Sequence, residues 1–469
     1  MNGSPPSVLH SLPERIDASA DVVVVGAGAC GLVAALRANA AGAEVIVLER
    51  DAAPSGSTSM SSGFVPAPAT TFQRKAGIAD DTPERFVADI MAKSKGRAVP
   101  HLAELAARNI GPALEWLAEA HGIEWSVLAD FLYPGHSRHR MHAVPEKTGA
   151  GLMARLLAAG EAQGIPLVTN ARAVRLFMEN GHVAGIGIER PDGAEETIAC
   201  RALVLACNGF GGNAELVRQH IPEIAGGLYH GHAGNTGDAL AWGRALDAET
   251  RHLSAYQGHG SLAHPHGILI SWALMTKGAI QVNASGERFS DESGGYSEQA
   301  VHVLRQPDGT AWNIYDSHIH EFAQDFPDYR DAMAAGAILQ AGDVGELARV
   351  AHLPEAGLSR TLDHVEACRK AGGRDLFGRD FTAFPPWEPP YHAVRVTGAL
   401  FHTQGGLMID AKTRVTRRDG SPFQNLFAGG GAACGVSGPD VSGYLSGNGL
   451  LTAIAFGFIA GESAASAGA

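Results

Sequence analysis

The stretch that most restricts the fold is DVVVVGAGACGLVAALRANAAGAEVIVLER, residues 21 to 50. Its run of valines predicts a buried strand, and the alanine-rich segment predicts a helix that ends before a second apolar strand. Gly26, Gly28 and Gly31 have the spacing GxGxxG where the first strand meets the helix, and Glu49 stands near the end of the second strand. The sequence therefore predicts a βαβ unit near the N-terminus.

Each of these residues suits a dinucleotide. The first glycine permits a tight turn, the second lets the backbone approach a pyrophosphate, and the third lets the helix pack closely on the strand. The N-terminus of the helix then attracts the phosphates, and Glu49 accepts hydrogen bonds from ribose hydroxyls. The pattern predicts a dinucleotide cofactor but does not by itself distinguish FAD from NAD.

Along the rest of the chain, the composition and the pattern of predicted elements change in one region. Residues 1–250 and 391–469 alternate strand-like and helical segments, and glycine motifs resume in the second part, in HTQGGLMID and NLFAGGGAACG. Residues 251–390 are richer in histidine and aromatic residues and end in FPPWEPPYH. We therefore predict an α/β fold in which a Rossmann-like cofactor domain, 1–250 and 391–469, receives an inserted α+β capping domain, 251–390.

Composition limits the partners. With 45% hydrophobic and 18% charged residues among 469, the chain can bury a sizeable core. Its net charge of -13 disfavours nonspecific attraction to nucleic acid or an anionic membrane. We see neither a signal-peptide pattern nor a run of about 18 apolar residues. We expect no nucleic-acid partner, no membrane span and a cytoplasmic location.

The cysteines and histidines show no haem or metal pattern. The five cysteines form no CxxC or CxxCH, which excludes a c-type haem. His259, His264 and His266 fall close together, but no acid or cysteine ligands accompany them. We expect no metal site, so an external electron acceptor or donor is needed.

A series of motifs resembles a known group of proteins. In order they are GAGACGLVAALRA, SGSTSMSSG, RALVLACNGFGGN, GNTGDALAWG, GAIQVNASGERF, HTQGGLMID and LFAGGGAACG. Together they resemble the FAD-binding flavoproteins that include fumarate reductase, the succinate dehydrogenase flavoprotein subunit and the 3-ketosteroid dehydrogenases, from about residue 21 to 463. The resemblance implies FAD, a mobile capping domain that closes over it, and chemistry at the domain interface.

The resemblance also implies where FAD lies. Gly209 would lie near the flavin nucleotide, Asp238 near the adenine, and residues 402–406 along the isoalloxazine edge. The full set of cofactor contacts that we expect is Gly26, Gly28, Ala29, Cys30, Gly31, Glu49, Arg50, Ser57, Thr58, Ser62, Gly63, Ala173, Cys207, Gly209, Asp238, Thr403, Gly405, Gly430, Ser446, Gly447 and Leu450.

Two departures from the family concern this cofactor. Membrane-bound members carry a covalent flavin bond on a histidine where this chain has Ser57, so we expect noncovalent FAD. Other members have AGE, whose acid holds the ribityl chain, where this chain has three glycines, residues 429–431. The ribityl contact must therefore come from elsewhere.

Three segments bear on the substrate. Fumarate reductases hold a dicarboxylate with two arginines and two histidines, because a carboxylate in a closed site needs charge compensation. The resemblance keeps one histidine as His259, but the acid-donating arginine falls on Tyr296 and the carboxylate-clamping arginine falls on Tyr444. This pattern resembles the ketosteroid dehydrogenases, in which tyrosines occupy these regions, and it predicts a ketone in place of two carboxylates.

In those dehydrogenases a tyrosine hydroxyl and a backbone N–H polarise a ring carbonyl, a second tyrosine removes the α-proton, and flavin takes a hydride from the β-carbon. We expect Tyr444, with an N–H from residues 446–449, to polarise the carbonyl and Tyr296 to move the proton. The alternative for Tyr296 is a cap residue after two glycines. Further candidates are His259 and Arg288, as aids to the ionisation of Tyr296, His402, as a flavin or substrate contact, and Tyr391, in the pocket.

We therefore predict an FAD-dependent dehydrogenase that introduces a C=C bond α,β to the carbonyl of a cyclic or steroid-like ketone. One alternative is the reverse reaction, an ene-reductase acting on an enone or unsaturated carboxylate, because the direction depends on the flavin potential and the redox partner. A second alternative is an FAD-binding subunit whose partner supplies the activity.

If FAD is held without a covalent bond, acid precipitation of the purified protein will release yellow FAD into the supernatant. The residue at the family's attachment position, Ser57, has no ring nitrogen with which to form the bond. Absorbance of the supernatant and the washed pellet measures the two fractions. A pellet that stays yellow would show a covalent link.

Overall fold

The first lobe is built on a mixed sheet. In a computed structural model, which describes residues 4–467, the strands β7, β3, β2, β10 and β21 of this sheet run parallel. In spatial order the sheet contains β1 (Ser7–Leu9), β8 (Arg172–Glu179), β9 (His182–Glu189), β10 (Glu195–Leu205), β2 (Ala18–Val25), β3 (Val45–Leu48) and β7 (Leu167–Val168), with β21 (Pro422–Ala428) paired to β10 and β20 (Arg414–Thr416) paired to β21.

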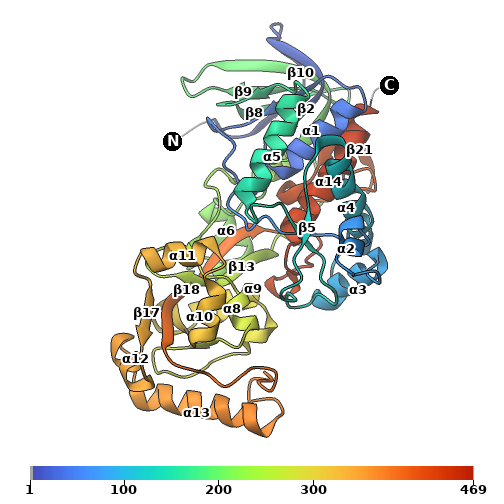
Figure 1. Cartoon of the computed structure of the whole chain (residues 1–469). Helices are drawn as coiled ribbons and strands as arrows, with labels where there is room; N and C mark the ends of the chain where they lie inside the picture. Colours follow the sequence, from blue (N-terminus) through green and yellow to red (C-terminus); the bar gives the residue numbers. More distant parts are fainter. Residues whose placement is uncertain (1–3, 468–469) are drawn as a thin grey trace.

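Helices lie against this sheet (Figure 1). The valines of β2 are buried, as in a parallel sheet covered on both faces. The helices of the lobe are α1 (Ala29–Ala40), α2 (Thr71–Lys75), α3 (Pro83–Lys93), α4 (Pro100–His121), α5 (Gly149–Ala162), α7 (Asp238–Ala245) and α14 (Asn448–Ala465). Of these, α1 connects β2 to β3 through the glycine turn, so the predicted βαβ unit is present.

The helices α1 and α14 approach each other through glycine. A Cβ atom on Gly457 would stand 2.4 Å from the carbonyl oxygen of Cys30, and one on Gly461 would stand 2.2 Å from that of Ala34. Only residues without a side chain allow this distance between the two backbones. The contact aligns the N-termini of both helices, which begin after Gly28 and Gly447, toward the same part of the molecule.

A second sheet forms the other lobe. Its strands in spatial order are β14 (Ile268–Leu269), β13 (Tyr256–Ala263), β18 (Tyr391–Thr403), β16 (Thr310–Tyr315) and β15 (Ile280–Val282), with β11 (Leu228–Tyr229) and β17 (Ile338–Ala341) also paired to β18. The helices of this part are α6 (Ala214–His220), α8 (Ala273–Thr276), α9 (Tyr296–Leu304), α10 (Ser317–Ala323), α11 (Pro327–Ala334), α12 (Val344–Val350) and α13 (Glu355–Ala371). In Figure 1 α12 and α13 lie at the end of the molecule farthest from the first sheet.

The position of β18 differs from the domain division that the sequence predicts. We expected residues 391–469 to return to the cofactor domain, but β18 begins at 391 and pairs with three strands of the second sheet, β13, β16 and β17, besides β11. The proline-rich segment before it precedes a strand and does not mark the boundary. We therefore propose that the second lobe continues through β18, while the fold class, a Rossmann-like domain with an inserted α+β domain, is confirmed.

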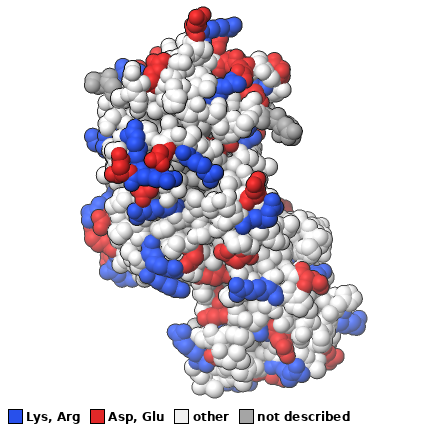
Figure 2. All heavy atoms as spheres, turned by 180° about the vertical axis from the view of Figure 1, so that it is seen from behind, with Lys and Arg blue, Asp and Glu red and all other residues white. Residues whose placement is uncertain are grey.

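Two small sheets complete the frame. The strands β4 (Val65–Pro66), β6 (Met141–Ala143) and β5 (Ser126–Val127) pair near the start of α14, and β12 (Thr250–Arg251) pairs with β19 (Gly406–Leu407). Figure 2 shows acidic and basic side chains interspersed over the face that it presents. Among residues 4–467 no helix combines the length and apolar character needed to cross a membrane.

Candidate active site

A cavity of about 580 Å³ is lined by residues of both lobes. The first lobe contributes the glycine turn before α1, residues 56–64, residues 230–238 and the start of α14. The second lobe contributes β13, β14, the start of α9, the start of α11 and the end of β18. The cavity therefore lies at the interface between the lobes.

The glycine turn opens the N-terminus of α1 to this cavity. Gly26 has φ +107°, and a Cβ atom there would stand 2.5 Å from the carbonyl oxygen of Ala206. Gly28 is the N-cap residue of α1, no side chain caps the helix, and its first turn has no acidic residue. The partial positive charge of the helix N-terminus is thus available to a diphosphate in the cavity.

Glu49 is fixed beside the turn. Its carboxylate accepts hydrogen bonds from the N–H groups of Ala27, at 3.2 Å, and Asp51, at 3.1 Å. Burial raises the pKa of Glu49, while these two N–H groups oppose the shift. Because Glu49 lines the cavity, its remaining lone pairs can accept hydrogen bonds from ribose hydroxyls.

Most of the expected cofactor contacts line the cavity. These are Gly26, Gly28, Ala29, Cys30, Glu49, Arg50, Ser57, Thr58, Ser62, Gly63, Ala173, Cys207, Asp238, Gly430, Ser446, Gly447 and Leu450. They come from segments as distant in the sequence as β2 and α14, so only the folded chain brings them together.

Four expected contacts are not among the lining residues, and the three glycines of this group allow close packing. A Cβ atom on Gly31 would stand 1.8 Å from the carbonyl oxygen of Gly26, so this glycine brings α1 onto its strand. A Cβ atom on Gly209 would stand 1.9 Å from Oγ1 of Thr403, and one on Gly405 would stand 2.1 Å from the carbonyl oxygen of His252. Gly31, Gly209, Thr403 and Gly405 lie outside the lining, and their contact with the cofactor stays a prediction.

Asn208 is a lining residue that the sequence reasoning missed. Its Nδ2 donates to Oγ of Ser57 at 2.8 Å. Its Oδ1 lies 2.0 Å from the position that a Cβ atom of residue 431 would take. Asn208 thus fills the space beside the three glycines where other members carry an acid. Its positive φ of 64°, in the CNGFGG turn, is the signal that could have pointed to it.

The other end of the cavity holds a cluster of aromatic rings, of which His259 and Tyr296 are stacked and the others meet edge to face. The His259 ring, from β13, lies 4.9 Å from the Tyr296 ring at 25°, and the Tyr296 ring lies 6.0 Å from that of Tyr444. The His402 ring, from β18, lies 5.7 Å from the Tyr444 ring on its other side. The structure therefore brings these four predicted residues together from four separate segments.

Burial keeps these groups uncharged. It raises the pKa of Tyr296 to about 12, although hydrogen bonding to Ser446 and Tyr444 opposes the shift. Burial also raises the pKa of Tyr444 well above its ordinary value, against the effect of the N–H groups of Gly449 and Gly447. It lowers the pKa of His259 to about 3 and that of His402 to about 4. At neutral pH both tyrosines hold their protons and both histidines are neutral.

Two predicted residues lie elsewhere. The guanidinium of Arg288 is buried in ion pairs with Glu292, at 2.7 Å, and with Asp375, and it does not line the cavity. Tyr391 begins β18 and packs in a hydrophobic cluster of the second lobe, also outside the lining. The structure corrects both expectations: Arg288 neutralises buried acids, and Tyr391, which is partly exposed, packs against the edge of a core cluster.

This site can be compared with known proteins. The model of the FAD binding domain family matches residues 21–450. The chain belongs to the FAD binding domain family. Its cavity fits that cofactor, because the uncapped helix N-terminus and the held carboxylate of Glu49 face the same space.

Relatives of this FAD binding domain protein include reductases and dehydrogenases. A probable fumarate reductase, Ifc3, of Shewanella frigidimarina (strain NCIMB 400) is 29% identical over 95% of this chain and 74% of its own length. The 4-oxocyclohexanecarboxylate 2-dehydrogenase of Sinomonas cyclohexanicum is 25% identical over 95% of each chain. The structure of 3-ketosteroid-Δ4-(5α)-dehydrogenase from Rhodococcus jostii RHA1 in complex with 4-androstene-3,17-dione has a TM-score of 0.76 and 25% identity, covering 98% of this chain and 99% of that one. The protein is thus an FAD-dependent oxidoreductase of the class acting on CH–CH groups.

In this FAD binding domain protein the reactive end of the cavity has an aromatic wall that the sequence reasoning missed. Tyr133, on the loop between β5 and β6, lines the cavity with Phe64 and Phe326. The Tyr133 ring lies 6.4 Å from that of Phe64, and burial and the nearby Tyr296 raise its pKa. No family motif marks Tyr133, and its only signal is the pair of aromatic residues before the Pro-Gly turn in FLYPGH.

Buried neutral histidines at the site predict loss of stability in acid. Burial lowers the pKa of His136, His142 and His402 from 6.5 to about 4 and that of His259 to about 3. Below pH 6.5 the unfolded chain therefore binds more protons than the folded chain. The contribution of these histidines to the free energy of unfolding is fully present above pH 6.5 and is lost as the pH falls toward 4. Thermal unfolding followed by flavin fluorescence should show a nearly constant Tm above pH 7 and a falling Tm below about 6. The variant His142→Gln should show a shallower fall, and an unchanged Tm down to pH 4.5 would contradict the expectation.

Proposed function

We propose that the protein is an FAD-dependent dehydrogenase that introduces a C=C bond α,β to the carbonyl of a cyclic or steroid-like ketone, with FAD held noncovalently. The observation that carries the proposal is the pair of uncharged phenols, Tyr296 and Tyr444, whose rings lie 6.0 Å apart at the start of α14. A protonated phenol can donate to a carbonyl oxygen, but it cannot neutralise a carboxylate. The site therefore suits a neutral ketone.

The charges and walls around these phenols support the same substrate class. The lysine and arginine side chains that line the cavity within residues 4–467 are Arg50, Lys147 and Arg172, all from the first lobe. The wall near Tyr296 contains Trp272 and Leu269 of the second lobe in addition to the aromatic wall. An apolar ring system finds dispersion contacts there, whereas a second carboxylate would be left unpaired.

The carbonyl oxygen would be held by Tyr444. Its hydroxyl, together with an N–H group of Gly447 or Gly449 at the N-terminus of α14, can donate hydrogen bonds to the oxygen as enolate charge develops. A well-placed donor of this kind contributes roughly 3 to 4 kcal/mol to transition-state stabilisation. When bound, FAD supplies the acceptor of the hydride that leaves the β-carbon.

Tyr296 would take the α-proton without first becoming a phenolate. With a pKa of about 12, full ionisation at pH 7 would cost about 7 kcal/mol. The hydroxyls of Ser446 and Tyr444 oppose the rise in its pKa, so they are the polar groups near its own hydroxyl. We infer that the phenol oxygen receives the α-proton as its own proton passes to the hydroxyl of Ser446, whose proton in turn passes to solvent, so that Tyr296 and Ser446 both stay neutral.

A specific observation also favours the reverse reaction as a second candidate. A phenol that holds its proton at neutral pH is a ready proton donor to the α-carbon of an enone. The relatives with the name fumarate reductase are consistent with a reductive direction, although their substrate has two carboxylates. Either direction requires an external electron acceptor or donor, and the Sinomonas and Rhodococcus dehydrogenases support the oxidative one.

A substrate screen tests the proposed function. Under anaerobic conditions, cyclic and steroid-like ketones should bleach the oxidised flavin of the purified protein, whereas succinate should not. Absorbance of the flavin is the measurement, and addition of an enone to photoreduced protein tests the reverse direction. Rapid bleaching by succinate, or rapid reoxidation by fumarate alone, would overturn the assignment of a ketone.

The variant Tyr296→Phe tests the proton-transfer role. Removal of a general acid–base typically lowers a rate by about 100- to 10,000-fold. Stopped-flow measurement of flavin reduction should show a loss of this size, with FAD content and substrate Kd little changed. The matched control is Tyr391→Phe, because Tyr391 lies outside the cavity. If Tyr296→Phe reduces its flavin at near the wild-type rate, Tyr296 serves only as the first residue of α9.

A further inference from the structure

His136 lies behind the cavity and contacts the backbone at the start of α14. Its ring is buried, with 6% of the residue exposed. The Nε2 atom lies 2.9 Å from the carbonyl oxygen of Ser446, and the Nδ1 atom lies 3.3 Å from Nη1 of Arg140. The ring therefore connects a buried guanidinium to the peptide group that precedes Gly447.

These two partners determine the tautomer of the ring. A carbonyl oxygen can only accept, so Nε2 carries the hydrogen and donates it to Ser446. A guanidinium can only donate, so Nδ1 is unprotonated and accepts from Arg140. Burial and the charge of Arg140 lower the pKa of His136 to about 4, which agrees with this neutral form.

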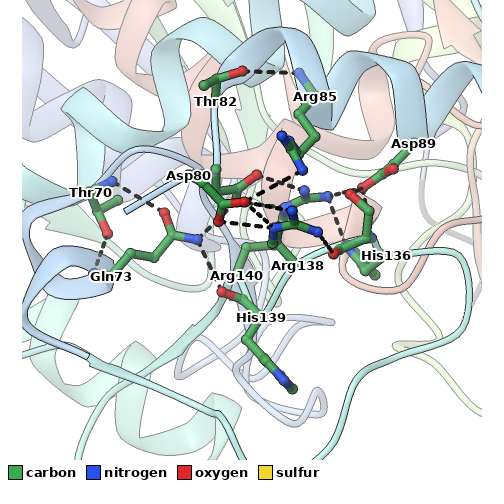
Figure 3. Close-up of polar contacts among 12 residues, drawn as sticks. Thr70, Gln73, Asp80, Thr82, Arg85, Asp89, His136, Arg138, His139 and Arg140 are labelled. Carbon is green, nitrogen blue, oxygen red and sulfur yellow. Dashed lines mark hydrogen bonds and ion pairs between the residues drawn. The ribbon is translucent and has the colours of Figure 1, made fainter. Parts of the chain in front are cut away.

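Arg140 is held on its other sides by two acids, the buried Asp81 and the partly buried Asp89, and Figure 3 shows Arg140 beside Asp89 and His136. Its Nε and Nη2 donate to the two oxygens of Asp81 at 3.0 and 2.8 Å, and its Nη1 lies 2.5 Å from Asp89. The guanidinium also lies over the Phe86 ring, 4.5 Å from the centroid. Since the Arg140 and Asp81 side chains are fully buried, the guanidinium has a fixed position from which to orient His136.

The direction of the Ser446 carbonyl decides the direction of the next N–H group. The peptide bond between Ser446 and Gly447 is trans and planar, so its C=O and N–H point in opposite directions. The C=O points to His136, which is not among the cavity-lining residues, whereas Ser446 and Gly447 themselves line the cavity. The N–H of Gly447 is therefore turned away from His136, toward the side of the cavity that holds Tyr444.

Gly447 has few other restraints on this orientation. It is the N-cap residue of α14, with φ +85°, and no side chain caps the helix. A glycine peptide can rotate more readily than that of any other residue. The hydrogen bond from His136 to the Ser446 carbonyl thus restrains the peptide from the side opposite Tyr444.

We propose that His136 is a positioning residue, which holds the Ser446–Gly447 peptide so that the Gly447 N–H joins the Tyr444 hydroxyl as a donor to the substrate carbonyl oxygen. The chain of contacts runs from Asp81 and Asp89 through Arg140 and His136 to the backbone of the oxyanion site. The catalytic role of the Gly447 N–H rests on the proposed function. The orientation of the peptide by His136 rests on the peptide geometry alone.

Two variants of His136, which differ from each other by one methylene group, distinguish its hydrogen bond to Ser446 from its hydrogen bond to Arg140. In His136→Gln the amide reaches the position of Nε2 and can still donate to Ser446. In His136→Asn the amide lies near the position of Nδ1, so it can accept from Arg140 but does not reach Ser446. Both residues are polar and neutral, so neither leaves a buried charge unpaired.

The first measurement is the rate of flavin reduction by the best ketone of the screen. Loss of one oxyanion donor typically lowers kcat by about 100- to 1,000-fold, so a misdirected donor in His136→Asn should lower it by at least about 10-fold. KM should change by less than about threefold, because the contact is made mainly in the transition state. His136→Gln should stay within about threefold of wild type. Equal rates for the two variants, whether both high or both low, would overturn the proposal.

The second measurement does not depend on catalysis. Hydrogen–deuterium exchange of the holoprotein should be faster in the peptide covering residues 443–450 for His136→Asn than for wild type, with His136→Gln close to wild type. If none of the ketones in the screen reduces the flavin of the wild-type protein, the proposed function fails. The difference in exchange between the variants still tests whether His136 positions the peptide. Equal exchange in both variants would overturn the structural part of the proposal.

Discussion

The close contact between the backbones of α1 and α14 is the constraint on which the site depends. Gly457 and Gly461 allow α14 to approach α1 to a distance that any side chain would prevent. Both helices begin at an uncapped glycine that lines the cavity, Gly28 in α1 and Gly447 in α14. Two partial positive charges therefore face one space, and in the proposed function the first serves the diphosphate of FAD and the second a developing oxyanion.

Two buried arginines are paired with acids outside the cavity that holds Tyr296 and Tyr444. Arg140 pairs with acids behind the wall of the cavity, and Arg288 pairs with acids inside the second lobe. A further ion pair joins the lobes: Lys93, at the end of α3, pairs with Glu298 of α9 and donates to the carbonyl oxygen of Gly294 at 2.9 Å. These contacts hold the segments that carry the reactive groups, while Tyr296 and Tyr444 remain neutral in a medium of low dielectric constant.

Much of the cofactor end was predictable because it depends on local backbone geometry. The spacing of Gly26, Gly28 and Gly31 requires a turn between strand and helix whatever the rest of the chain does. The same reasoning was wrong for Arg288, which belongs to the motif GAIQVNASGERF but is paired with Glu292 and Asp375. It missed Tyr133 and His136, because the loop that carries them has no motif, and only the fold brings this loop to the start of α14.

The sequence by itself determined the Rossmann-like turn, the dinucleotide class of the cofactor and the presence of tyrosines at positions where relatives with a dicarboxylate substrate need arginine. Only the tertiary structure decided that Tyr296, Tyr444, His259 and His402 share one end of one cavity and that burial leaves them all uncharged. The physical reason is that a glycine turn is specified by neighbouring residues through their allowed dihedral angles. A pKa shift and a contact between rings instead depend on which distant segments of the chain come together and exclude water.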